Sequence, residues 1–138
     1  MCIRDSSGKS LDTEYIKFRL NEYDEHALEE AVCLKEAGQA SEVIAIALDG
    51  EEVDKVLFSA MAKGADKAIK ITGVEAEGSR SAASLFAEVV GTEYDLIMTG
   101  VQSVDDREGM MGPMLSSMLK IPCAVSYTHL TLPTNREV

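Results

Sequence analysis

The sequence predicts an α/β domain built on a doubly wound parallel sheet. Short apolar runs alternate along the chain with longer segments in which apolar residues recur every three or four positions. That order is typical of parallel strands joined by right-handed helical crossovers. The apolar runs are rich in Val, Ile and Ala, as in strands that are buried on both faces. A length of 138 residues is that of one ordinary domain.

The first elements surround a buried strand. Residues 15–20 alternate loosely between apolar and polar, which indicates a short edge strand or an extended lead-in. A helix is expected over residues 24–37, because its apolar residues have helical spacing and Asn21 or Asp24 can cap its start. Gly38 suits the left-handed residue that ends such a helix. The continuous apolar run at residues 42–48 predicts the first strand.

The same alternation continues through the middle of the chain. Residues 51–63 form an expected helix that ends at Gly64, and residues 68–71 form a short second strand. Residues 79–90 carry an apolar stripe at helical spacing and are expected to form the third helix.

The last elements repeat the pattern once more. The apolar run at residues 94–99 ends in Gly100 and predicts a third buried strand. A fourth helix is expected over residues 108–119 and a fourth strand over residues 121–125.

The composition excludes several classes of function. Thirteen Lys and Arg oppose 24 Asp and Glu, a net charge of −11, which argues against binding to nucleic acid or to anionic membranes. No apolar run approaches the ~20 residues that a membrane span needs. Three cysteines without a CxxC pair favour a reducing cytoplasm over a disulfide framework or a zinc site.

The two ends of the chain differ in composition and periodicity from the residues between them. Residues 1–6 and the Thr-rich residues 126–138 lack the periodicities of the middle. We interpret both as non-native adapter sequence, and residues 7–125 as the partial domain.

Two loops follow strand ends and are candidate ligand sites, because ligands of parallel sheets bind beyond the carboxyl ends of the strands. One is Asp49-Gly50 and the other is the segment 100–112, GVQSVDDREGMMG. The three glycines of the second loop let backbone approach a ligand, and a helix start offers N–H groups to a phosphate. Asp105 and Asp106 fit either ribose hydrogen bonds or simple helix caps, so a nucleotide loop and an ordinary capped loop remain alternatives.

No constellation of catalytic residues can be assembled. Motifs of the GxxxxGK[ST] and GxGxxG types are absent, and His26 reads as a solvated side chain. The carboxylates at 105, 106 and 108 are interpreted as solvated caps and not as a magnesium site. Cys33 and Cys123 read as inert packing thiols.

Four ordered segments resemble a known family. They are LNEYDEHALEEAVCLKEAG, EVIAIALDG, SAMAKGADKAIKI and YDLIMTGVQSVDDREGMMGPMLSSMLKIP. Together they resemble the small (beta) subunit of the electron-transfer flavoprotein family over nearly all of residues 9–125. The resemblance implies a Rossmann-like domain that binds an adenine nucleotide. It also implies that the sheet here lacks its first central strand, which lies upstream in the family, and that about half of the subunit lies downstream.

The resemblance also implies a function and a site. It implies an electron carrier without catalytic residues of its own, which binds AMP or a second FAD. Its partners would be an alpha subunit that holds the redox-active FAD, and acyl-CoA or other dehydrogenases. Asn21, Tyr23 and Asp24 fall on the nucleotide-contacting helix start, and Leu48 ends the strand beside the adenine. The loop around phosphate and ribose comprises Gly100, Val101, Gln102, Ser103, Val104, Asp105, Asp106, Arg107, Glu108, Gly109, Met110 and Met111.

Three departures from the family pattern affect the ligand. Val101 stands where many members have Lys, Met110 where Gln is common, and Glu22 where Pro is usual. The first removes a cation and the second an amide donor, so backbone N–H groups would have to hold the phosphate.

Two other classes compete with the carrier. A stand-alone nucleotide sensor of the universal-stress type would need a G-x2-G-x9-G-[ST] loop, which the glycine spacing does not supply. An ATP-pyrophosphatase would need an SGGxDS-type loop after a first strand, and the sequence has none.

Overall fold

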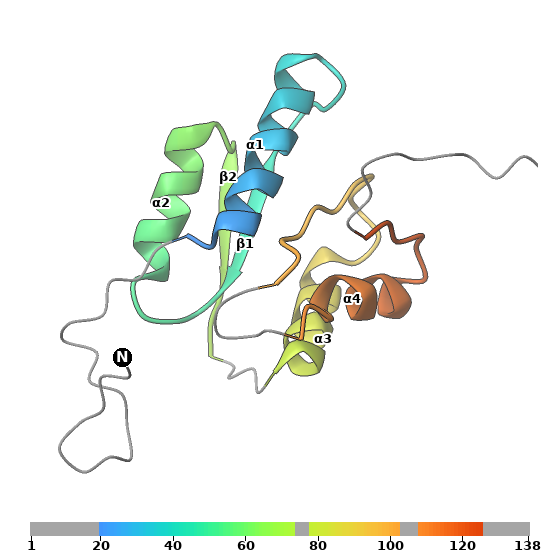
Figure 1. The fold of residues 1–138 in the computed structure, drawn as a ribbon. Coiled ribbons are helices and arrows are strands. Elements are labelled where there is room, and N and C mark those ends of the chain that lie inside the picture. The colour runs from blue at the N-terminus through green and yellow to red at the C-terminus, as the bar shows by residue number, and fades with distance from the viewer. Residues whose placement is uncertain (1–19, 74–77, 103–107, 126–138) are drawn as a thin grey trace, which may run out of the picture.

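The computed structural model describes residues 20–73, 78–102 and 108–125 (Figure 1). The first five elements along the chain follow the predicted order of helices and strands. The elements are α1 (Glu22–Glu36), β1 (Ile44–Leu48), α2 (Val53–Lys63), β2 (Lys67–Ile71), α3 (Ser79–Val90) and α4 (Met111–Leu119). Residues 1–6 and 126–138, and nearly all of the expected lead-in at 15–20, lie outside the described residues.

β1 and β2 form a parallel two-stranded sheet, with register from Ile44 opposite Lys67 to Leu48 opposite Ile71. The parallel pair joined through α2 confirms the first predicted strand-helix-strand unit. Every side chain of β1 is half-buried and none is fully buried. In the described part of the chain β1 has a single neighbouring strand, so one of its two edges is unpaired. The doubly wound arrangement therefore stays a prediction.

The third and fourth predicted strands are wrong in the described structure. Neither 94–99 nor 121–125 is assigned to a strand. An apolar run becomes a strand only when a neighbour accepts and donates its ladder hydrogen bonds, and no described strand pairs with either run. Leu96, expected inside the sheet, is instead 63% exposed.

The helices α1 and α2 lie together against the sheet (Figure 1). Val43, Ala60 and Ala65 are buried at the centre of this unit. Leu28 and Ala31 of α1 pack against them, as the helical spacing of the sequence predicts. Small side chains dominate this cluster, so the backbones of helix and sheet approach one another closely.

α1 ends as predicted, but it starts differently. Gly38 has φ +72°, its N–H donates to the carbonyl of Lys35, and the N–H of Gln39 donates to that of Leu34. This is the Schellman pair of bonds. Asn21 occupies the N-cap position, yet its side chain makes no capping hydrogen bond. That amide is engaged elsewhere, as described below.

α3 and α4 form a second packed unit, visible as the yellow and orange pair in Figure 1. Ala83, Val90 and Leu115 are buried in it, with Ala83 fully inaccessible. α3 has the predicted bounds. α4 begins at Met111 and not at residue 108, because Gly109 at φ +63° adopts a left-handed conformation that a right-handed helix cannot include. Among the described residues, no helix combines the length and the apolar character needed to cross a bilayer.

Asp66 fastens the start of the sheet to α1. Its carboxylate accepts a hydrogen bond of 2.6 Å from Lys35 Nζ and one of 2.9 Å from the backbone N–H of Val43. The hydrogen bond from Lys35, followed by that from Val43, lowers the pKa of Asp66.

This carboxylate should make stability depend on pH. Because the pKa of Asp66 is lower in the folded than in the unfolded chain, its contribution is present above the unfolded value of about 4 and is lost as the pH falls through the folded value. Between pH 7 and pH 3 the melting temperature of Asp66→Asn should therefore fall less than that of the wild type. Thermal unfolding followed by circular dichroism at both pH values measures this difference, and equal falls would contradict it.

Candidate functional site

Eleven of the sixteen predicted site residues are described. The loop residues 103–107, namely Ser103, Val104, Asp105, Asp106 and Arg107, lie outside the described part of the structure. The remaining ones come from the start of α1, the end of β1, the segment 100–102 and the approach to α4.

Two hydrogen bonds join the start of α1 to the segment after residue 99, and a third links two residues within the start of α1. The backbone N–H of Gly100 donates to Asp24 Oδ1 at 2.8 Å. Asn21 Nδ2 donates to Asp24 Oδ2 at 2.9 Å and to the carbonyl oxygen of Gln102 at 2.9 Å. The residues joined are 76 and 81 positions apart in the chain. The structure therefore brings Asn21 and Asp24 together with Gly100 and Gln102, and this contact links the α1–α2–sheet unit to the segment that precedes α4.

Gly100 is a glycine because Asp24 leaves no room for a side chain. A Cβ on Gly100 would lie 2.4 Å from Asp24 Oδ1, 2.8 Å from Asp24 Cγ and 3.0 Å from the backbone N of Asp24. Contacts this short require a shift of backbone as well as side chain.

The other two glycines of the loop also make room for protein atoms. A Cβ on Gly109 would lie 3.1 Å from the carbonyl oxygen of Val101, and a Cβ on Gly112 would lie 2.9 Å from Thr99 Oγ1. The sequence suggests that these glycines admit a ligand, whereas in the structure each of them meets another part of the loop or α1. Sequence reasoning misses Thr99, since a hydroxyl against a glycine 13 positions away leaves no periodic signal.

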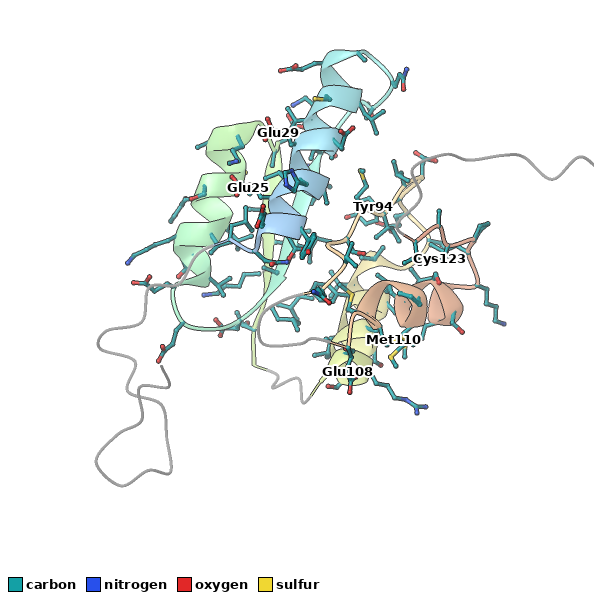
Figure 2. All side chains as sticks on the ribbon, viewed as in Figure 1. Glu25, Glu29, Tyr94, Glu108, Met110 and Cys123 are labelled. Atoms are coloured by element: carbon teal, nitrogen blue, oxygen red, sulfur yellow. The ribbon has the colours of Figure 1, made fainter. Side chains whose placement is uncertain are left out.

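The start of α4 offers backbone donors to an anion. The first turn of a helix exposes N–H groups and the positive end of the dipole. Met111 and Gly112 carry such groups, whereas Pro113 has none. Val101, whose surface is 45% exposed, supplies no charge. Figure 2 shows Glu108 and Met110 beside the α3–α4 pair.

Two predicted residues stand apart from the hydrogen-bonded group. Leu48 ends β1 and pairs in register with Ile71. Tyr23 lies in the first turn of α1 with 46% of its surface exposed. Figure 1 shows that β1 ends toward the same end of the molecule at which α1 begins.

A lysine beside the Asp49-Gly50 loop is already paired with carboxylates. Lys70 Nζ lies 2.9 Å from Asp54 Oδ1 and 3.2 Å from Asp49 Oδ1. Hydrogen bonds to Asp54 and then to Asp49 raise the pKa of Lys70. With Lys70 held by two carboxylates, this loop is a poorer candidate for anion binding than the start of α4.

Other polar residues have structural or solvated roles. Figure 2 shows Glu25 and Glu29 where α1 faces α2, and Lys63 of α2 pairs with both. The hydrogen bond from Lys63 lowers the pKa of Glu25. The His26 side chain is 74% exposed, which confirms a solvated histidine. In the described ranges, no group of three or more His, Cys, Asp or Glu could hold a metal ion.

Both described cysteines differ from expectation. Cys33 and Cys123 are exposed, so the prediction of packing thiols is wrong. Cys33 lies on α1 outside its buried contacts, and Cys123 belongs to the run that forms no strand.

An open apolar hollow of about 350 Å³ lies elsewhere, between α2 and β2. Its lining residues are Asp54, Leu57, Phe58, Met61, Ala68 and Lys70. None of them belongs to the group around Asp24 and Gly100.

Comparison with known proteins gives a consistent picture. The model of the electron transfer flavoprotein domain matches residues 9–137. Electron transfer flavoprotein subunit beta of Methylophilus methylotrophus is 34% identical over 127 residues, covering 89% of this chain and 48% of the relative. The Bacillus subtilis subunit beta is 34% identical over 117 residues, covering 82% and 45%. The mitochondrial subunit beta of Arabidopsis thaliana is 30% identical over 129 residues, covering 93% and 51%. The chain thus spans about half the length of the curated relatives it matches.

Proposed function

The chain belongs to the electron transfer flavoprotein family, and from this premise we propose that it acts as a beta subunit: a non-catalytic carrier component that binds an adenine nucleotide. The observation that carries the proposal is the junction of Asn21 and Asp24 with Gly100 and Gln102. It joins, across 76 and 81 positions, the two segments to which the family resemblance assigns the nucleotide.

The ligand we propose is AMP or FAD. Support comes from the chemistry of the described residues: backbone N–H groups at the start of α4 suit one phosphate, and Val101 and Met110 add no charge that would demand a highly charged ligand. The family resemblance assigns the contacts to Asn21, Tyr23, Asp24, Leu48 and the loop from Gly100 to Met111. AMP would act as a structural ligand, whereas FAD would supply redox chemistry.

We propose an FAD-bearing alpha subunit as the obligatory partner, with acyl-CoA or other dehydrogenases as electron donors to the complex. The named relatives are beta subunits, and a subunit designated beta has at least one further subunit as its partner. We also propose a cytoplasmic location, in keeping with the sparse cysteines, although one relative is named as mitochondrial. Residues 1–6 and 126–138 remain proposed adapter sequence.

Titration of the chain with AMP and with FAD tests the ligand. Isothermal titration should give saturable one-to-one binding of at least one of the two, with GMP as the control that shares the phosphate and lacks the adenine. Co-expression with an alpha subunit of a related electron transfer flavoprotein should yield a yellow complex on affinity purification. Adenine-nucleotide binding without any such complex would favour the stand-alone sensor. Failure of both experiments would refute the proposal.

A further inference from the structure

We infer that Asp24 is a positioning residue: its carboxylate, oriented by Asn21, locks the turn Gly100–Gln102 onto the start of α1 and does not itself contact the nucleotide. This inference deepens the proposed nucleotide-binding function and rests on it. It changes the role that the family resemblance implies for Asn21 and Asp24, from ligand contact to support of the loop that makes the contact.

Three hydrogen bonds form this attachment of the turn to α1, which we call the lock. Each oxygen of the half-buried Asp24 carboxylate already has a protein partner, Gly100 N–H on Oδ1 and Asn21 Nδ2 on Oδ2. The Asn21 amide has two hydrogens, and its two bonds go to Asp24 Oδ2 and to the carbonyl of Gln102. The Asn21 donor capacity is therefore used within the protein.

The position of the turn also determines which residues are available to a ligand. Bonds from N–H groups to a carboxylate are charge-assisted and roughly twice as strong as neutral ones. No Cβ fits on Gly100 beside Asp24, so Asp24 holds the turn through the Gly100 backbone. Val101 and Gln102 follow Gly100 in the chain and therefore lie next to this contact. Those two residues and the start of α4 remain as the surface on which a phosphate and ribose can rest.

A first test uses the ligand-free 138-residue chain. In Asp24→Asn, the amide oxygen can accept from the Gly100 N–H only if the amide NH₂ faces the NH₂ of Asn21. The hydrogen bond between residues 21 and 24 is then lost. The amide hydrogen of Gly100 should then exchange about 10-fold faster, measured by NMR. Asn21→Asp places two carboxylates together and should have a similar or larger effect. Unchanged exchange in both variants would overturn the lock.

A double variant that swaps the two side chains separates positioning from general damage. When Asn21→Asp is combined with Asp24→Asn, the amide introduced at position 24 can donate to the carboxylate introduced at position 21. It can still accept from Gly100, while the bond to Gln102 is lost. Gly100 exchange should therefore be slower than in Asn21→Asp alone, where two carboxylates face each other.

Glu22→Gln is the matched control for these variants, because it makes the same change of charge in the same turn as Asp24→Asn. It should leave the exchange of the Gly100 amide unchanged. A double variant that exchanges no more slowly than Asn21→Asp would contradict the inference.

A second test separates positioning from contact with ribose. Asp24→Asn should weaken the binding of AMP and of 2′,3′-dideoxy-AMP by the same factor, about 10-fold, as measured by isothermal titration. If Asp24 accepted hydrogen bonds from the ribose hydroxyls, the variant would lose affinity for AMP alone, and the inference would be overturned. If the wild type binds neither compound, the proposed function fails, whereas the Gly100 exchange rates still decide whether the lock exists.

Discussion

Replacing Gly100 by alanine should raise the dissociation constant for AMP by about 100-fold and lower the free energy of unfolding by about 1–3 kcal/mol. The new methyl carbon would lie 2.4 Å from Asp24 Oδ1 and 3.0 Å from the backbone of the same residue. A rotation of the Asp24 side chain relieves the first contact only, so the turn has to move away. Both bonds that cross to the turn, from Gly100 to Asp24 and from Asn21 to Gln102, are then stretched or lost.

Gly50→Ala is the matched control for this experiment. Gly50 follows β1, and like Gly100 it has no left-handed φ, but a Cβ there would meet only Val53 Cγ2, at an ordinary 3.4 Å. Isothermal titration and urea denaturation of both variants give the two quantities. An alanine at position 100 that binds and unfolds like the control would show that the turn is not held against Asp24.

Leu115→Ala should lower the free energy of unfolding by about 2–5 kcal/mol. Leu115 is 3% exposed and lies in the unit where Ala83 and Val90 of α3 are also buried. Removing three carbons from this buried side chain leaves a cavity that the surrounding structure fills only in part. With total stabilities of about 5–15 kcal/mol, this loss would remove a large share of the stability of the domain.

Two further variants serve as comparisons for the loss in free energy of unfolding that the cavity causes. Leu115→Met keeps most of the volume and should cost less than about 1.5 kcal/mol. Met118→Ala truncates a side chain on the same helix that is 40% exposed, and should change stability by about 0.5 kcal/mol or less. Chemical denaturation of the three variants measures the series. A loss at Met118 as large as that at Leu115 would contradict the burial of the α3–α4 contact.

The sequence predicts local features well because they depend on neighbours in the chain. The apolar stripe of α3 and the left-handed Gly38 both follow from residues within one or two turns, and both are found as expected. The runs at 94–99 and 121–125 show the opposite case. Their composition suits strands, but a strand is defined by its partner, and apolar composition carries no information on whether a partner strand is present.

The candidate site likewise has some features that can be predicted and others that depend on distant partners. The family resemblance assigns both segments to one ligand, and in the structure Asn21 and Asp24 contact Gly100 and Gln102. The manner of meeting was not predictable. Asn21 fits a helix cap from sequence, yet its amide bonds to Asp24 and Gln102, because a turn 81 positions away offers a carbonyl at 2.9 Å. Side-chain bonds over such separations have no period that a sequence pattern can reveal.

The junction between Asp24 and Gly100 also has a kinetic meaning. A contact that closes a loop of 76 residues becomes favourable only after the elements on either side have ordered. The two bonds that cross to the turn therefore belong to the last steps of folding and are weakly formed in the transition state. Energy gained that late slows unfolding and leaves the folding rate almost unchanged. The start of α1 thus governs how long the assembled site persists, more than how quickly it is built.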